Sequence, residues 1–254
     1  PKFHVINSLN MNIWKLKKNN KKSSSNAWNS KEWLDKIDQR IKNNIVSLKS
    51  KNSIKINTFC AESPLPIMLL SQKKKVKILD FGAGSLEIPL KLAFDTNIKS
   101  QIQIDIIESR TLIDLYKQNF KKVKLPKNIK INFNEEINFK KRYDIFHFSD
   151  SFQYVDDWKI FIKKLIKNSP NFIIFNNLTA GENPTYSALQ KFYKFEIPYR
   201  FYNIKKLIKE LMPYTLIYKS KLLNKISNKY SKYPQNNFKK NYRLGYPCTL
   251  IFKK

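Results

Sequence analysis

The sequence predicts an α/β fold built on a mostly parallel sheet of seven strands, with helices on both faces of the sheet. The chain of 254 residues suits one such domain with an appendage, or two small domains. From residue 76 onward, short apolar runs alternate with amphipathic segments, which is typical of a parallel sheet. The last two runs are joined by a polar connection without a convincing helix, which predicts an antiparallel pair at one edge of the sheet.

The predicted strands and helices follow one another in a regular order. The strands are expected at residues 76–81, 101–108, 129–134, 143–148, 171–176, 214–220 and 248–254. Helices are expected at residues 86–94, 111–120, 157–167 and 203–212, and a shorter one is expected within 63–72. Pro89 is expected to interrupt the first of these helices early, whereas Pro64 and Pro66 suit the start of the short one.

The first part of the chain predicts a helical cap preceded by irregular structure. Residues 1 to about 28 are polar, and the run NNKKSSSN at 19–26 is typical of a flexible loop. Ser30 has the character of an N-cap, and Glu32 lies in the first turn of a helix over 31–49. The apolar positions of this helix recur every three or four residues, at Trp33, Leu34, Ile37, Ile41, Ile45 and Leu48. We therefore expect an N-terminal extension over 1–58 and a Rossmann-like domain over 59–254.

The chain is strongly basic, with 49 Lys and Arg residues, 19 Asp and Glu residues and a formal net charge of +30. This charge favours a polyanionic partner such as nucleic acid, an anionic membrane surface or a phosphorylated glycan precursor. The alternative is a compositional bias, since Lys, Asn and Ile are abundant together; nonspecific, salt-dependent binding to polyanions is expected either way. No apolar stretch approaches the roughly 20 residues of a membrane helix, and the first residues lack the apolar core of a secretion signal, so we expect a cytoplasmic protein.

Cysteine and histidine are too few for a metal site or a disulfide framework. Cys60 and Cys248 have no metal-like spacing, and His4 and His147 are the only histidines. We expect no metal, and we interpret both cysteines as small buried side chains. His147 lies within an apolar strand and is therefore more typical of a hydrogen-bonded core residue than of a catalyst.

A glycine-containing turn follows the strand at 76–81. The segment DFGAGS at 80–85 brings Gly82 and Gly84 to the carboxyl end of a parallel strand, where ligands bind in open sheets. The next strand ends at Glu108, beside the turn, where a carboxylate can accept both hydroxyls of a ribose. Either feature alone is also found in a plain turn or a solvated strand end; together they favour a nucleoside-containing cofactor.

The residues around the turn distinguish among such cofactors. A dinucleotide fingerprint requires a third glycine where Glu87 stands, and no Gly-Lys-Ser/Thr sequence of a phosphate-binding loop is present. Asp80 would repel a pyrophosphate but suits a ligand that carries an ammonium group. The turn therefore favours S-adenosylmethionine over NAD.

Several segments carry a family resemblance. The segments ILDFGAGS, IDIIES and YDIFHFSDSFQYVDDW, with the terminal strand pair, resemble class I S-adenosylmethionine-dependent methyltransferases. The order of LDFGAG, IIES, SDSFQYVDD, FIIFNN and IPYRFYN is similar to that of a bacterial methyltransferase group associated with surface-polysaccharide biosynthesis. The resemblance covers residues 28 to about 220. It implies a small or glycan-linked methyl acceptor.

The resemblance also implies roles for individual positions. The methionine portion of the cofactor is expected at Asp80, Phe81, Gly82, Ala83 and Gly84, and the ribose at Glu108. Asn134 or Glu135 is expected near the adenine edge, and Ser149 and Asp150 on the methyl-donor side. The chain departs from the group at Ser85-Leu86, where a further glycine is common, and at FNNLTAGENP (175–184), which replaces an Asp-Arg-Thr-Pro-like segment. The second departure lies where an acceptor would bind.

Methyl transfer requires a general base only when the acceptor is a hydroxyl or another protonated group. Asp150 is the candidate base; the alternative is an ordinary loop carboxylate or helix cap. The aromatic and basic segment 181–202 would cover an acceptor or form a packed lid. Two further functions stay open: an RNA methyltransferase, favoured by the charge although the fourth strand lacks a base-methylating Asn/Asp-Pro-Pro-Tyr/Phe motif, and a binding module that keeps the fold without catalysis.

Overall fold

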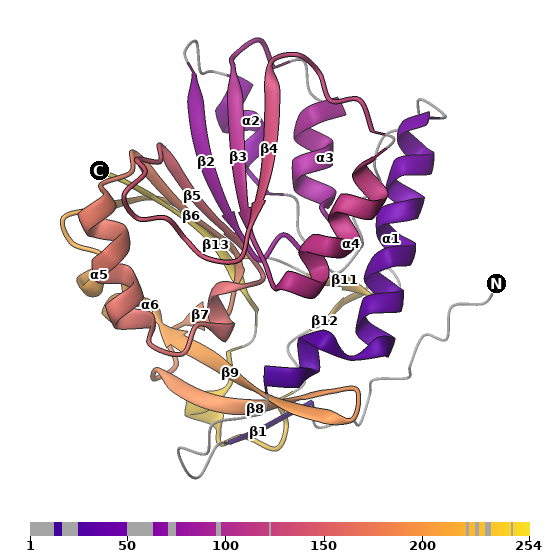
Figure 1. Cartoon of the computed structure of the whole chain (residues 1–254). Coiled ribbons are helices and arrows are strands. Elements are labelled where there is room, and N and C mark those ends of the chain that lie inside the picture. Colours follow the sequence, from indigo (N-terminus) through magenta and orange to yellow (C-terminus); the bar gives the residue numbers. More distant parts are fainter. Residues whose placement is uncertain are drawn as a thin grey trace.

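The computed structural model describes residues 13–16, 25–49, 63–70, 75–94, 98–121, 123–221, 224–226, 229–231, 235–244 and 246–254. The predictions for His4, Cys60 and most of the loop at 19–26 lie outside these residues. The main sheet has seven strands in the order β10-β13-β6-β5-β2-β3-β4 (Figure 1). Their bounds are β2 (Val76–Phe81), β3 (Ile102–Ile107), β4 (Ile129–Asn134), β5 (Ile145–Ser149), β6 (Phe172–Leu178), β10 (Thr215–Lys221) and β13 (Cys248–Lys253).

The pairing of these strands confirms the predicted fold class. Strand β2 pairs in parallel with β3 on one side and with β5 on the other, and β4 and β6 extend the parallel part. Strand β13 runs antiparallel to both β6 and β10, and so the two C-terminal strands form the expected antiparallel pair. The direction of chain progression reverses at β2, which places a topological switch point beside the end of this strand.

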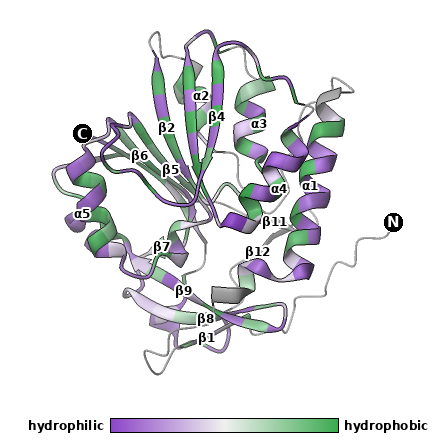
Figure 2. Cartoon of the chain, in the orientation of Figure 1, coloured by the Kyte–Doolittle hydropathy of each residue, from purple (hydrophilic) through white to green (hydrophobic). Residues whose placement is uncertain are grey.

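Within the described ranges, six α-helices pack against the sheet: α1 (Lys31–Lys49), α2 (Leu65–Leu70), α3 (Glu87–Phe94), α4 (Arg110–Phe120), α5 (Trp158–Asn168) and α6 (Ile204–Glu210). Helix α3 begins at Glu87, so Pro89 falls in its first turn and does not interrupt it, because the first amides of a helix have no partner within the helix. Ser30 precedes α1 as expected, but its hydroxyl has no hydrogen-bond partner among the described residues. Along α1 and α5, hydrophobic and hydrophilic residues alternate as in amphipathic helices (Figure 2).

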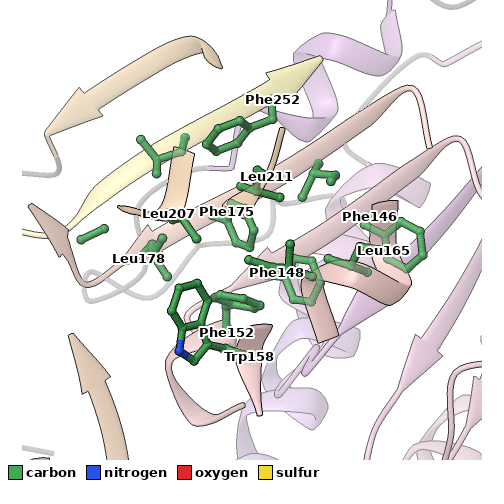
Figure 3. Close-up of a cluster of buried hydrophobic side chains, with 14 of the residues drawn as sticks. Phe146, Phe148, Phe152, Trp158, Leu165, Phe175, Leu178, Leu207, Leu211 and Phe252 are labelled. Carbon is green, nitrogen blue, oxygen red and sulfur yellow. The ribbon is translucent and has the colours of Figure 1, made fainter. Parts of the chain in front are cut away.

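Apolar side chains from α1 to α4 form one core with one face of the sheet, and those from α5 and α6 form another with the opposite face. Neighbouring residues of a strand point to opposite faces, so Ile78 joins the first core and Leu79 the second. Figure 3 shows the second core, in which Phe146, Phe148 and Phe175 of the sheet lie beneath α5 and α6. Burying each such side chain contributes roughly 1.5–3 kcal/mol.

A second sheet lies beyond the carboxyl ends of the main strands (Figure 1), in the order β1-β8-β9-β7. Its bounds are β1 (Trp14–Leu16), β7 (Ala180–Gly181), β8 (Tyr186–Phe192) and β9 (Phe195–Asn203). The prediction of irregular structure over 1–28 is wrong at β1, which pairs antiparallel with β8, and the segment 181–202 forms mainly an antiparallel hairpin. Every second residue of the β9 segment Ile197, Tyr199 and Phe201 is buried. This spacing of large apolar residues is typical of a strand and is the sequence signal that the prediction missed.

The remaining elements are short. They are the 3₁₀ helices η2 (Ser25–Asn29), η3 (Phe152–Tyr154) and η4 (Lys240–Tyr242) and the strand pair β11 (Asn224–Ile226) and β12 (Lys229–Ser231). No helix in the described part of the chain has both the length and the hydropathy needed to cross a membrane. Element η3 follows β5 directly and therefore bears on the geometry described next.

Candidate functional site

The residues predicted for the site lie at the ends of four adjacent strands. Phe81 is opposite Ile107 and Phe148, and Ile107 is opposite Asn134, so the ends of β2, β3, β4 and β5 are aligned. The predicted residues at or just beyond these ends are Asp80 to Gly84 after β2, Glu108 after β3, Asn134 and Glu135 after β4, and Ser149 and Asp150 after β5. The parallel register thus brings them all to one edge of the sheet.

Gly82 is required by both its conformation and its packing. Its φ is +73°, in the left-handed region that favours glycine. A Cβ at this position would lie 2.6 Å from Cβ of Ser151, and the Ser151 hydroxyl donates a hydrogen bond to the carbonyl of Phe81 at 2.6 Å. The turn after β2 is therefore packed directly against the segment that follows β5, while the Phe81 ring itself packs against Phe148.

Gly84 differs from Gly82 because its missing side chain faces open space. Its φ is +55°, and a Cβ built on it would have no heavy atom of the described chain within 4 Å. Its amide donates to Glu108 Oε1 at 3.0 Å, and its carbonyl accepts from the hydroxyl of buried Tyr116 at 2.5 Å. The backbone at Gly84 is thus fixed by its neighbours and open on the side where a ligand could approach.

Leu86 explains how the turn forms without the additional glycine. Leu86 has φ of +60°, a conformation that costs a residue other than glycine about 1–2 kcal/mol. Its side chain is fully buried in the core beneath α1 to α4, and burial of a leucine offsets a cost of this size. The turn at Ser85-Leu86 therefore adopts a left-handed backbone at Leu86 without the further glycine that is common in the resembling group.

Glu108 is a partly buried carboxylate beside the glycine turn. Its two oxygens accept from the amides of Gly84 and Ser109, the latter at 3.3 Å. Burial raises the pKa of Glu108 to about 7, the nearby Asp80 charge adds to this rise, and the two amides oppose it. A ligand that brings hydroxyl donors or positive charge to this position would favour the ionised form of Glu108.

Two further carboxylates lie close to the turn. Asp80 is 2% exposed and its Oδ1 lies 2.8 Å from Nδ1 of His147, which is itself fully buried and hydrogen bonded, as its place in an apolar strand predicts. Glu87, at the start of α3, accepts a hydrogen bond from the Ser85 hydroxyl at 3.0 Å. Asp80, Glu87 and Glu108 make this part of a strongly basic protein acidic. Such a turn disfavours a phosphate and suits a cation.

Asn134 and Glu135 lie farther along the same edge. The Asn134 carbonyl accepts the amide of Glu108 at 3.1 Å, which connects the ends of β3 and β4. The Glu135 carboxylate is exposed and pairs with Arg110 at 3.0 Å. Both therefore lie next to the Glu108 side of the turn. Ala83, between the two glycines, contacts the core beneath α1 to α4.

Asp150 follows β5 in an unusual backbone conformation. Its φ is +53°, which aspartate tolerates better than most residues, and its amide donates to the Asn176 carbonyl at 2.9 Å. Its carboxylate accepts a hydrogen bond from the Gln153 side-chain amide. Burial raises the pKa of Asp150 to about 7, and the Gln153 amide opposes that rise. The neighbouring Ser149 hydroxyl accepts from the Asn176 side chain at 3.1 Å.

The site contains no recognisable metal centre. Within the ranges that the structure describes, no group of three or more His, Cys, Asp or Glu side chains could hold an ion. Cys248 is buried and donates to the Ala180 carbonyl, and burial raises the pKa of its thiol to about 12.

Solved structures of methyltransferases share this architecture. A structure of the complex between the Haloferax volcanii Trm112 methyltransferase activator and a methyltransferase aligns with 91% of this chain and 98% of its own, at 9% identity and a TM-score of 0.52. Magnesium protoporphyrin IX methyltransferase from Synechocystis PCC 6803, solved with bound SAM, aligns with 90% of this chain and 94% of its own, at 12% identity and a TM-score of 0.50. The chain has the class I methyltransferase fold. No protein-family model matches the sequence, and no curated protein does.

An aromatic cluster joins the second sheet to the edge of this methyltransferase fold. Trp28 of η2 contacts Trp33 of α1, Phe192 at the hairpin tip and Tyr154 of η3, with ring centroids 4.8–5.6 Å apart. The Tyr154 hydroxyl also donates to the Gln190 side chain at 3.0 Å. The contacts between these rings could not be predicted from local sequence patterns, because the rings come from three distant segments of the chain.

Strand β9 fixes the segment that carries the Asp150 partner. The Arg200 guanidinium donates to the carbonyls of Val155 and Asp156 at 2.9 and 2.5 Å, and the Tyr202 hydroxyl donates to the Phe152 carbonyl at 3.0 Å. These bonds hold both ends of η3, and with it the Gln153 side chain beside Asp150. In this methyltransferase fold the added hairpin therefore supports the end of β5.

Proposed function

We propose that the chain binds S-adenosylmethionine at the turn after β2 and transfers its methyl group to a small acceptor that carries a hydroxyl. One observation carries the cofactor assignment: Asp80 and Glu108 lie beside Gly84, whose side-chain position is open, at the switch point of the sheet. S-adenosylmethionine has a sulfonium and an ammonium group, which the carboxylates would attract. Its ribose hydroxyls would donate to Glu108, and Asn134 or Glu135 would lie near the adenine.

The residues on the β5 side support transfer to a protonated acceptor. When bound, S-adenosylmethionine supplies an electrophilic methyl group on its sulfur. Asp150 would accept the proton of the acceptor hydroxyl as the oxygen–carbon bond forms and the carbon–sulfur bond breaks, its electron pair staying on sulfur. A base with a pKa near 7 is well matched to this task. Ser149 and the hairpin would help to position the acceptor, and alignment of the reactants can contribute roughly 7–11 kcal/mol.

Titration calorimetry with S-adenosylmethionine and S-adenosylhomocysteine, with NAD as the control, tests the cofactor assignment. We expect micromolar binding of the first two and none of NAD, because the acidic turn would repel its pyrophosphate. Absence of binding by folded protein would contradict the proposal and favour a binding module that keeps the fold. The acceptor is then sought by transfer of a labelled methyl group to hydroxyl compounds, including the nucleotide sugars and glycans that the sequence resemblance implies.

The Gly84→Ala variant tests whether the open face at the turn holds the cofactor. The added methyl group would stand where the ligand approaches, so we expect S-adenosylmethionine to bind at least tenfold more weakly. The left-handed φ should also reduce the free energy of unfolding by about 1–2 kcal/mol. Ile37→Val, in the core beneath α1, is a control of similar stability, since this change typically costs about 0.5–1.5 kcal/mol. Equal affinity of Gly84→Ala and Ile37→Val would contradict the assigned site.

RNA as the acceptor is tested separately through salt dependence. Lysines are exposed along α5 and α6, for example Lys163, Lys164, Lys205 and Lys206, and they would bind any polyanion. Nonspecific binding of a single-stranded RNA should fall by more than roughly 100-fold between 50 and 200 mM salt, because counterion release dominates it. Filter binding over this range measures the effect. Tight binding that persists at 200 mM would favour RNA over a small acceptor.

A further inference from the structure

A chain of three buried side chains runs from the start of α2 to the glycine turn. Ser63 Oγ lies 2.8 Å from His147 Nε2, and His147 Nδ1 lies 2.8 Å from Asp80 Oδ1. Asp80 and His147 are directly opposite each other in the β2–β5 register. The three residues are 6%, 0% and 2% exposed, in the order Ser63, His147 and Asp80. No local sequence pattern predicts this contact, because Ser63, Asp80 and His147 come from separate segments of the chain.

One assignment of donors and acceptors, with a neutral His147 ring, satisfies every atom of this hydrogen-bonded chain. The Leu65 amide donates to Ser63 Oγ at 3.2 Å, so the serine oxygen is an acceptor there and its own proton is available to His147 Nε2. In this assignment the ring proton lies on His147 Nδ1 and is donated to the Asp80 carboxylate. Both ring nitrogens of His147 are satisfied in this arrangement, and the orientation of the ring is fixed from both ends.

This arrangement resembles a hydrolytic triad in its residue types but differs in its surroundings. Ser63 Oγ already accepts the Leu65 amide at the start of α2 and contacts His147 Nε2, and so this oxygen is engaged by the protein itself. Asp80, in contrast, immediately precedes the turn residues Phe81 and Gly82. The Asp80 carboxylate is therefore the group that can meet a ligand at the turn, and Ser63 and His147 support it through hydrogen bonds.

We propose that Ser63 and His147 are positioning residues that fix the Asp80 carboxylate for the ammonium group of the bound cofactor. This inference rests on the proposed function, because it assigns a contact within the same site. A buried carboxylate without a donor would turn toward other partners or take up a proton. With one oxygen held by His147, its charge stays at the turn. Ser63 and His147 thereby select ligands that carry an amino-acid end.

Two ligands isolate this contact. S-adenosylhomocysteine carries the ammonium and carboxylate groups, whereas 5′-methylthioadenosine has the same adenosine and thioether but lacks them. The wild-type protein should prefer the first. His147→Leu, which removes the donor, should reduce the ratio of the two affinities about tenfold by weakening S-adenosylhomocysteine alone. His147→Asn retains a side-chain N–H near the position of Nδ1 and should restore most of the preference.

Two further variants make the measurement decisive. Glu108→Gln should weaken both ligands alike and leave their ratio unchanged, because both contain the ribose. If His147→Leu does not fold in a thermal melt, Ser63→Ala, which frees only the far end of the ring, should still lower the ratio about threefold. Equal weakening of both ligands, or an unchanged ratio in the His147 and Ser63 variants, would overturn the positioning role while leaving the proposed function intact. Failure of wild-type protein to bind either ligand would overturn both.

Discussion

Replacing Glu108 by glutamine is expected to weaken S-adenosylmethionine binding by roughly 100-fold, because the ribose hydroxyls lose a charged acceptor. Hydrogen bonds to charged groups are worth about 1.5–3 kcal/mol, and a loss of about 3 kcal/mol corresponds to roughly 100-fold in affinity. Glutamine keeps the length of the side chain, and its oxygen can still accept the Gly84 amide now 3.0 Å from Glu108 Oε1. Calorimetry of both proteins measures the difference. An affinity within threefold of wild type would show that the ribose does not bind Glu108.

The same carboxylate should make binding depend on pH. Burial raises the pKa of Glu108 to about 7, and hydroxyl donors bind the ionised form. The dissociation constant of wild-type protein should therefore rise up to tenfold per pH unit as the pH falls below 7. In Glu108→Gln this dependence should be absent. Titrations from pH 5.5 to 8.5 measure it, and a parallel rise in the variant would locate the titrating group elsewhere.

The stability of the ligand-free protein should depend on pH in the opposite direction to ligand binding: it should decrease as the pH rises. A folded-state pKa of about 7 for Glu108, above its ordinary value of 4.5, means that the folded state holds this proton more tightly than the unfolded state. The resulting stability is fully present below pH 4.5 and is lost as pH rises through 7; it amounts to about 3 kcal/mol. Asp150 acts in the same direction. Denaturant unfolding at pH 5 and pH 8 should show a smaller decrease in Glu108→Gln than in wild type.

The meeting of the candidate site residues at one edge of the sheet could be predicted because the rules that relate sequence to a parallel sheet are local. Apolar runs specify the strands, and parallel pairing then brings residues just beyond each run to one edge. Asp80, Gly84, Glu108 and Asp150 came together for this reason, although they span 70 positions of the sequence. Their position at one edge of the sheet follows from the strand order and requires no prediction of side-chain contacts between distant segments.

The parts that escaped prediction depend on contacts between distant segments. The hairpin of β8 and β9 appeared as an aromatic and basic insertion, and its meeting with Trp28 and Tyr154 is a tertiary contact. The partners of His147 were also hidden, because Ser63 lies 84 positions away. Leu86 shows a third kind of difference: a left-handed residue need not be glycine when its side chain is buried deeply enough.

The largest effect on catalysis is expected from Asp150→Asn, which should reduce kcat by roughly 10²–10⁴-fold, the usual contribution of a general base. Asparagine has nearly the same shape and adopts φ near +53° readily, so the end of β5 should keep its structure. Binding of S-adenosylhomocysteine should be nearly unchanged, because the proposal assigns Asp150 to the acceptor and not to the cofactor. The measurement is methyl transfer to the hydroxyl acceptor found by the screen, at saturating cofactor. Full activity of the variant would show that the acceptor needs no base at this position.

The pH dependence distinguishes a base from a residue that only supports the loop. With the pKa of Asp150 at about 7, kcat of wild-type protein should rise as pH passes through 7 and level off above 8, because only the ionised carboxylate accepts a proton. The Gln153 amide donates to that carboxylate and opposes the rise in its pKa. Gln153→Leu removes this donor and should shift the midpoint of the profile to higher pH. Leucine is tolerable there, since the other side-chain atom, Gln153 Oε1, is buried without a partner among the described residues. A midpoint that stays in place, with kcat reduced at every pH, would mean that Gln153 and Asp150 shape the segment after β5 without exchanging the acceptor proton.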